Sequence, residues 1–401
     1  MFWVRIAISS LVLLFGIGTT WSLSYKWIIL GSLLYAIPLL FQITKRSILK
    51  SIGIWIGIFL LTQSLISSYI MERKMKTLKP FFNKTWDVRG GIAGVNGLQR
   101  ITTDAKGFRV TKTINYDKKE SIRIFAFGSS STEQIFIDDT KTWTHLLQQK
   151  LEDKVQDQVE VINAGVSGTR VIHCYVTLEN IKGYKPDIAI FYVGMNDAYQ
   201  HILTYFDPLY RFAFDNTFLG RQIKGLFYTF KNENPGDHSK PEIVYGEDYD
   251  RKRDSLGRSP TKTFRPGAVS KNFDKYVQRI IDVCRRNGII CIFMTQRCGY
   301  QESASDKFKK GFWMTPPETR YTLDFDSLVY ISELYKNYVV NLGANEGVYV
   351  FDTESVILPS YDFLYDDCHL NINGAGRISE ALSEFIVPII GNLKSGKVVQ
   401  P

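Results

Sequence analysis

Short apolar runs alternate with helical patterns along most of this 401-residue chain. The run at 188–193 is apolar at nearly every position, which is typical of a parallel strand buried on both faces. Four further runs share this character: Ile122–Phe127, Val159–Ile162, Ile289–Met294 and Val348–Phe351. The last helical pattern carries an apolar stripe at Ile378, Ala381, Leu382, Phe385 and Ile386. The alternation predicts an α/β fold with three layers (α/β/α), in which helices cover both faces of a parallel five-stranded sheet.

Four short polar segments accompany this pattern, and the first three directly follow predicted strands. They are Phe127-Gly128-Ser129-Ser130-Ser131-Thr132, Asn163-Ala164-Gly165-Val166-Ser167-Gly168, Gly194-Met195-Asn196-Asp197 and Asp366-Asp367-Cys368-His369. Ligands bind at the carboxyl ends of parallel strands, so we expect the first three segments to meet at one edge of the sheet.

These segments contain the side chains that a serine enzyme needs for cleaving esters. The Ser130 hydroxyl is a weak nucleophile until a base takes its proton, and His369 is the candidate base. Asp366, three residues earlier, can accept the Nδ1 proton of His369 and stabilise the imidazolium. The backbone N–H groups of Ser130 and Gly168 and the amide of Asn196 could hold the oxyanion. This chemistry requires no metal, and we predict no cofactor.

In this order, the four segments resemble the blocks of the SGNH (GDSL-type) hydrolase superfamily. The resemblance covers about residues 100–390 and implies a flavodoxin-like sheet. It places the nucleophile of that family on Ser130 and the oxyanion donors on Gly168 and Asn196. The Asp-x-x-His pair of the family falls on Asp366 and His369.

One block departs from the family pattern. The usual Gly-Asp-Ser reads Gly128-Ser129-Ser130 here, which keeps the nucleophile but removes an acidic neighbour. Because Ser129, Ser130 and Ser131 are consecutive, the choice among them depends on the alignment.

Three apolar stretches precede the large domain, at about 6–22, 27–43 and 52–70. Each is near the ~20 residues that span a bilayer, so we expect three N-terminal transmembrane helices. No small-residue cleavage site follows the first stretch before the next one begins, so we expect it to be retained and not removed as a signal peptide.

The basic residues gather around these stretches. The formal net charge is +9, and residues 1–79 hold nine Lys or Arg residues against one acid, whereas the rest holds 40 bases and 39 acids. The large domain therefore has almost no excess charge, which argues against nucleic-acid binding.

The positive charges around the three stretches are almost equally divided between the two sides of the membrane, so they determine the orientation only weakly. Counted across the predicted spans, four positive charges lie on one side and five on the other, which slightly favours a cytoplasmic domain. Membrane-tethered relatives in the resembled family commonly face away from the cytoplasm. Following that resemblance, we expect a multi-pass membrane protein with an exocytoplasmic catalytic domain.

The predicted organisation has three parts. Residues 1–79 form the membrane anchor, 80–121 a linker with lead-in strands, and 122–395 the hydrolase-like domain. An insertion at about 198–265 begins with many aromatic residues. It could pack a small core of its own, cover the site as a lid or acceptor surface, or contact the bilayer.

The resemblance implies a membrane-anchored serine esterase acting on carboxylic esters, with O-acetyl groups of an envelope or extracellular glycan or lipid as substrate. The alternative is an O-acyltransferase of polysaccharide modification, which would use the same triad and need a membrane protein partner. A catalytically silent scaffold or glycan-binding protein is the third hypothesis. Retention of the serine, asparagine, aspartate and histidine argues against it.

Overall fold

The computed structural model describes residues 75–208, 241–245, 247–248, 250–251, 254, 261–296, 299–313 and 322–396. All of them belong to one compact unit. The three predicted transmembrane helices lie outside the described residues. Among the helices that these residues form, none has the length and apolar character needed to cross a bilayer.

The centre of the fold is a five-stranded sheet in which every pairing is parallel. In chain order its strands are β3 (Ile122–Gly128), β4 (Val159–Asn163), β5 (Ile188–Tyr192), β8 (Ile290–Met294) and β10 (Tyr349–Phe351). Their spatial order is β10-β8-β5-β3-β4, which is the 2-1-3-4-5 order of flavodoxin-like sheets. The prediction of an α/β fold with a five-stranded parallel sheet is confirmed.

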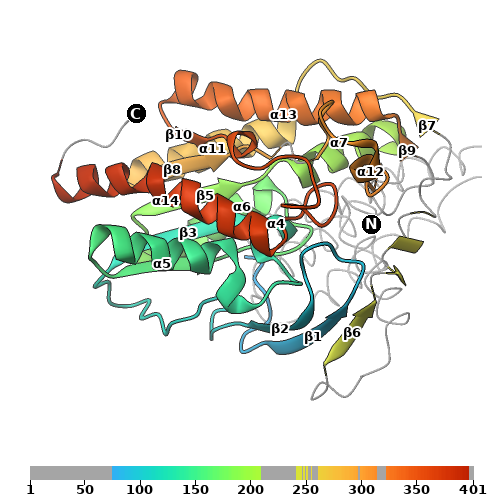
Figure 1. Ribbon diagram of the computed structural model, residues 1–401. Coiled ribbons are helices and arrows are strands. Elements are labelled where there is room, and N and C mark those ends of the chain that lie inside the picture. The colour runs from blue at the N-terminus through green and yellow to red at the C-terminus, as the bar shows by residue number, and fades with distance from the viewer. Residues whose placement is uncertain are drawn as a thin grey trace, which may run out of the picture. The chain divides into compact units, whose positions relative to one another are not determined.

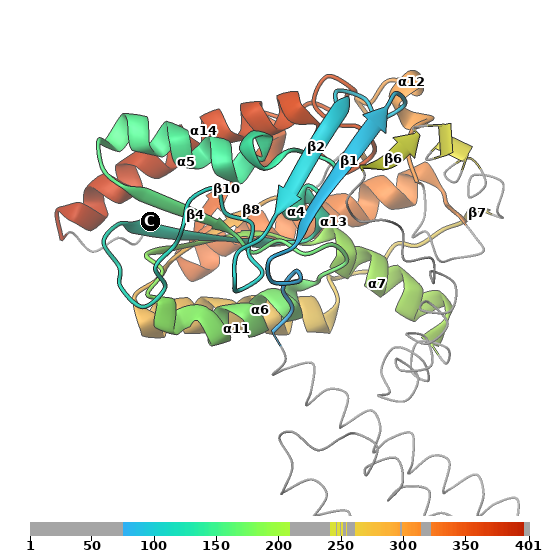
Figure 2. The same ribbon diagram turned by 90° about the horizontal axis from the view of Figure 1, so that it is seen from below.

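Helices cover both faces of this sheet (Figures 1 and 2). On one face α5 (Trp143–Val155) packs against α14 (Ile372–Lys394), and on the other α6 (Val171–Ile181) packs against α11 (Lys271–Asn287). The long helix α13 (Phe325–Glu346) contacts α7 (Met195–Phe206) and β10.

Polar caps set where several of these helices begin. Ser270, Asp324 and Asn371 each accept a backbone N–H of the first turn of the helix that follows. Short helical turns occur at α4 (Ser130–Glu133), η1 (Asp139–Lys141), η2 (Lys182–Tyr184), α12 (Asp306–Lys309) and η4 (Thr353–Ser355).

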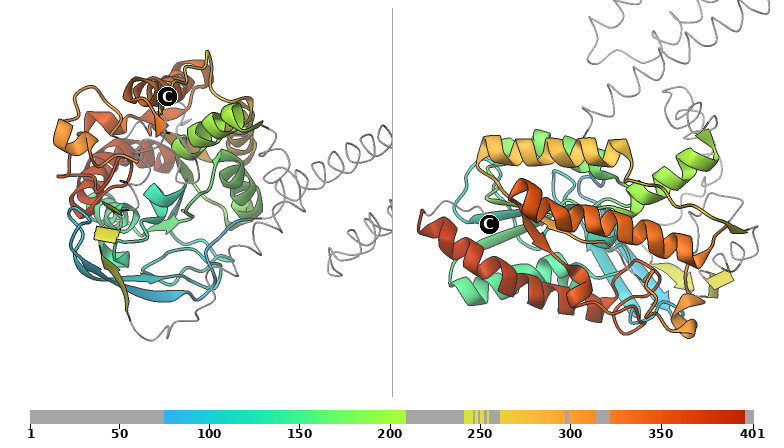
Figure 3. Two further views of the ribbon diagram at one scale, coloured as in Figure 1. Left: turned by 90° about the vertical axis from the view of Figure 1, so that its right-hand side faces the viewer. Right: turned by 90° about the horizontal axis from the view of Figure 1, so that it is seen from above.

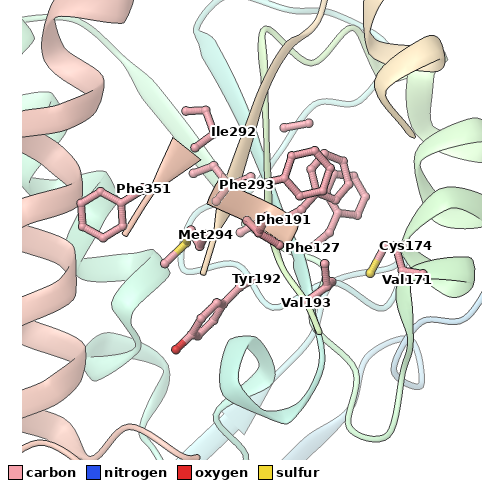
Figure 4. Close-up of a cluster of buried hydrophobic side chains, with 14 of the residues drawn as sticks. Phe127, Val171, Cys174, Phe191, Tyr192, Val193, Ile292, Phe293, Met294 and Phe351 are labelled. Atoms are coloured by element: carbon pink, nitrogen blue, oxygen red, sulfur yellow. The ribbon is translucent and has the colours of Figure 1, made fainter. Parts of the chain in front are cut away.

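The core of the sheet includes three stacked phenylalanine rings near the carboxyl ends of the central strands (Figure 4). Phe191 on β5 lies in register with Phe127 on β3 and Phe293 on β8. Its ring centroid is 4.9 Å from that of Phe127 and 5.2 Å from that of Phe293. This packing gives the loops after these strands a rigid base.

A smaller sheet precedes and supplements the large one. β1 (Asn83–Arg89) pairs antiparallel with β2 (Gly97–Thr102) and parallel with β6 (Glu242–Tyr245). Figure 3 shows β1 and β2 outside the layers of the large sheet. A separate pair of short parallel strands is formed by β7 (Thr261–Lys262) and β9 (Thr322–Leu323). Much of the predicted insertion at 198–265 lies outside the described residues.

The side chain of Arg123 is fully buried on β3 and satisfied by hydrogen bonds. Its Nε donates to Glu160 at 2.6 Å, and its Nη1 and Nη2 donate to the carbonyls of Tyr184 and Asn115 at 2.7 Å each. This arginine therefore links two strands of the sheet to the loops at their amino ends.

We expect Arg123→Met to lower the free energy of unfolding by about 3 kcal/mol, because it leaves the Glu160 carboxylate and two carbonyls without donors. Urea unfolding monitored by tryptophan fluorescence measures the change. Lys112→Ala is the matched control, because its pair with Glu152 is largely exposed and worth less than about 1 kcal/mol. Equal losses in both variants would contradict the structural role of Arg123.

Candidate active site

The turn after β3 presents Ser130 at the start of α4. Gly128 permits this turn, because a Cβ there would lie 2.7 Å from the carbonyl oxygen of Tyr192. Ser129 and Ser131 are buried, whereas Ser130 is partly exposed. The Oγ of Ser130 lies 2.7 Å from Nε2 of His369, so the geometry selects this serine among the three.

The loop before α14 places His369 against Asp366. Its Nδ1 lies 2.8 and 2.9 Å from the two carboxylate oxygens of Asp366. The carboxylate is completely buried, and it also accepts the backbone N–H groups of Cys368 and His369 at 2.9 and 2.8 Å. The indole Nε1 of Trp313 donates to the same carboxylate at 3.2 Å.

The electrostatics of the pair favour the imidazolium. Burial on its own lowers the pKa of His369, but the charge and hydrogen bond of Asp366 outweigh it and raise the pKa above its ordinary value. The neighbouring carboxyl behaves differently, because burial and the charge of Asp366 raise the pKa of Asp367 to about 7.

The two predicted oxyanion residues lie on the loops after β4 and β5. Gly168 is exposed and has a φ of +71°, a left-handed conformation that glycine adopts without strain. Asn196 lies in the first turn of α7, and its Nδ2 donates to the carbonyl of Thr169 at 2.8 Å. This hydrogen bond ties the amide to the residue after Gly168 and uses one of the two N–H donors of the amide group. The oxyanion role of both residues stays a prediction.

Sequence reasoning missed Gln296, which follows β8 and is buried. Its Oε1 accepts the backbone N–H of Met195 at 3.0 Å, and its Nε2 donates to Oγ of Ser131 at 3.1 Å. The Ser131 hydroxyl in turn donates to the carbonyl of Cys368 at 3.1 Å. Gln296 therefore connects two of the four polar segments directly, and the Ser131 hydroxyl extends the chain of hydrogen bonds to a third. The place of Gln296 two positions after the end of an apolar strand was the available signal.

Two further side chains, Glu133 and Asn163, join the turn that carries Ser130 to the loop after β4 that carries Gly168, called the glycine loop below. The buried Glu133 carboxylate accepts the backbone N–H of Ser167. Asn163 donates to the carbonyl of Thr132 at 2.7 Å and accepts the N–H of Gly165 at 2.9 Å. These bonds hold the loop that carries Gly168 against α4.

One group of potential metal ligands occurs among the described residues. Single ligand atoms of Asp366, Cys368 and His369 lie within 4.8 Å of one another. Two of these residues already hydrogen-bond each other in the arrangement of a serine-enzyme triad, so the donor set is accounted for without a metal ion. That no metal or cofactor takes part stays a prediction.

Residues 126–377 match the model of the GDSL-like Lipase/Acylhydrolase family. No curated protein matches the chain. The chain is similar to solved structures of a variant of the acetyl xylan esterase Axe2 from Geobacillus stearothermophilus (12% identity, 68% of this chain, 97% of that chain, TM-score 0.38). It is also similar to the esterase EstA from Pseudoalteromonas sp. (12% identity, 66% of this chain, 97% of that chain, TM-score 0.36). A third similar structure is that of a GDSL-like lipase from Bacteroides thetaiotaomicron (13% identity, 68% of this chain, 91% of that chain, TM-score 0.34). All three TM-scores are low, and the family assignment rests on the matched residues 126–377.

We expect Asn196→Ala to lower kcat for acyl release from p-nitrophenyl acetate by about 10²–10³-fold, because one oxyanion donor is removed. Steady-state kinetics with KM measured separately will show the loss in kcat. Asn180→Ala is the control, since that amide donates only within α6, to the carbonyl of Val176. A loss confined to KM, or a loss as large in the control, would argue against an oxyanion role.

Proposed function

Since the chain belongs to the GDSL-like lipase/acylhydrolase family, we propose that it is a membrane-anchored serine esterase of O-acetylated glycans or lipids. Family membership supports ester hydrolysis. The single observation that carries the mechanism is the continuous line from Ser130 Oγ through His369 to Asp366, with contacts of 2.7 and 2.8 Å. Here Ser130, His369 and Asp366 are the catalytic residues.

In the proposed reaction, Ser130 Oγ attacks the acyl carbon while His369 Nε2 takes the hydroxyl proton. The carbonyl π electrons move to its oxygen, which the N–H groups of Ser130, Gly168 and Asn196 stabilise. The tetrahedral intermediate then expels the alcohol, which receives the proton from His369, and an acyl-serine remains. Water attacks the acyl-serine by the same proton transfers, releasing the acid and restoring the hydroxyl.

Anchoring and location are proposed from the sequence. The three apolar stretches before residue 71 would hold the domain at the membrane, and the basic residues that flank them suit a position at the bilayer surface. We place the catalytic domain on the exocytoplasmic side, where an acylated envelope or extracellular polymer would be accessible. A membrane protein partner is part of this proposal only if acyl groups must be supplied.

The alternative function is O-acyl transfer, and the same acyl-serine supports it. If a sugar hydroxyl replaces water in the second half of the reaction, the products are an acylated glycan and the free serine. Three spans are few for a channel that passes acyl donors, so a transferase would depend on a membrane partner. A silent glycan-binding scaffold is a weaker alternative, because the Ser–His–Asp geometry is intact.

We expect the purified full-length protein to hydrolyse p-nitrophenyl acetate and acetylated xylan, and Ser130→Ala and His369→Ala to lower kcat by about 10⁴-fold or more. Ser129→Ala is the matched control, because the Ser129 side chain makes no capping hydrogen bond to α4. The readouts are product release and labelling of Ser130 by a fluorophosphonate. Labelling without turnover would favour the transferase, and a folded protein with neither would favour the scaffold.

We expect alkaline phosphatase fused after Pro401 to be active in cells, since that enzyme folds only outside the cytoplasm. A green fluorescent protein fusion at the same position should stay dark if exported in unfolded form. The reverse pair of results would place the catalytic domain in the cytoplasm and contradict the proposed location, while leaving the esterase proposal intact.

A further inference from the structure

The aromatic ring of Tyr365 lies flat against the imidazole of His369. The ring centroids are 5.2 Å apart and the planes differ by only 4°. The arrangement is fixed locally, because the backbone N–H of Tyr365 donates to the carbonyl of His369 at 3.0 Å and closes the loop on itself. Asp366 therefore holds one edge of the imidazole, and Tyr365 stacks on one of its faces in a parallel, offset arrangement.

Tyr365 is buried in a core separate from that of the large sheet. This second core contains side chains from the small sheet and from the segment after α4: Trp86, Val88, Ile92, Val95, Ile101 and Ile137. A line of edge-to-face contacts leads to the histidine. The ring centroids of Trp86 and Phe136 are 5.6 Å apart, and those of Phe136 and Tyr365 are 6.4 Å apart. The small sheet thus supports the ring that lies against His369.

A second contact joins the small sheet to the histidine loop. A Cβ added to Gly94, in the connection between β1 and β2, would lie 2.6 Å from Nδ2 of Asn371. Asn371 is two residues after His369 and caps α14 through Gly374. The β1–β2 connection therefore packs closely against the loop that carries the base.

The charge on His369 changes during the reaction, and this gives the stacked ring a chemical role. Attack by Ser130 converts the neutral imidazole to imidazolium, and a cation over the face of an aromatic ring is stabilised by the ring quadrupole. The titratable groups that face His369 are Asp366, Asp367 and the Cys368 thiol of its own loop, Glu133 of α4, and Tyr365 itself. Beyond this loop, Tyr300 donates to Asp367.

We propose that Tyr365 is a positioning residue that fixes the plane of the His369 ring and stabilises its imidazolium, and that the small sheet holds Tyr365 in place for this purpose. The proposal rests on the serine-esterase function proposed above. It gives the strands at residues 83–102 a role in the reaction although no residue of theirs belongs to the triad.

The test compares variants of the full-length protein in pH profiles of kcat/KM for p-nitrophenyl acetate. The acid limb reports the pKa of His369 in the free enzyme, because the base must be neutral to accept the serine proton. Tyr365→Leu removes the stacked ring, so the imidazolium loses a stabilising partner. We expect the acid limb to move down by about half a pH unit and the plateau kcat to fall about tenfold, with KM little changed.

Tyr365→Phe is the conservative variant. It keeps the ring and should retain the wild-type acid limb and kcat to within about twofold. Phe136→Leu removes the ring between Trp86 and Tyr365, so it should shift the acid limb in the same direction as Tyr365→Leu but by a smaller amount. Leu98→Ala is the control in the small sheet: this side chain on β2 is exposed and lies outside the core around Tyr365, so its removal should leave the acid limb unchanged. If Tyr365→Leu does not fold, Tyr365→Met fills a similar volume and takes its place.

The outcomes separate this proposal from the function on which it rests. Wild-type protein with neither turnover nor fluorophosphonate labelling would overturn the esterase function itself. An active wild type with the same acid limb and kcat in Tyr365→Leu would overturn the role of Tyr365. A fall in activity proportional to the loss of labelled protein, with no shift of the acid limb, would also overturn it, because that result reports only lost folding.

Discussion

The Asp366 carboxylate is the buried charge around which the candidate site is arranged. It has no contact with solvent, and burying an unpaired carboxylate would be prohibitively costly. Two backbone N–H groups of its own loop, the Trp313 indole and the His369 ring meet its two oxygens. These bonds fix the loop, and the loop fixes the imidazole at 2.7 Å from Ser130. The position of the candidate base His369 is thus a consequence of satisfying one carboxylate.

The remaining loops are held by polar side chains that cross between them. Gln296 joins the Asn196 turn to Ser131, and Asn163 and Glu133 join the glycine loop to α4. Since parallel strands end at one edge of the sheet, four loops crowd together there with many backbone groups to satisfy. Buried amides and carboxylates meet that need, and in doing so they fix the distances between loops. The same residues therefore serve both stability and the geometry of the site.

The sequence was sufficient for features that depend on local pattern. The five strands follow from continuous apolar runs, and the Asp366–His369 spacing places both side chains on one turn. Gln296, Glu133 and Tyr365 were missed, because their roles depend on contacts that no local pattern records. Gln296 and Ser131, for example, are 165 positions apart. The pairing of β1 with β6 is equally non-local, since residues 86–89 meet residues 242–245. Local patterning gives the elements, whereas such contacts are decided by packing.

The histidine lies where two separate hydrophobic cores meet. The carboxylate that holds its edge follows the last strand of the large sheet, whereas the ring on its face is buried with side chains of the small sheet. An imidazole held only at its edge can still rotate about the hydrogen bond, and a flat aromatic neighbour removes that freedom. Orientation of the base affects the rate steeply, because the proton must move along the line to Ser130 Oγ. In the proposed mechanism the small sheet therefore belongs to the functional unit, and a domain defined to begin at β3 would lack one of the two supports of the candidate base.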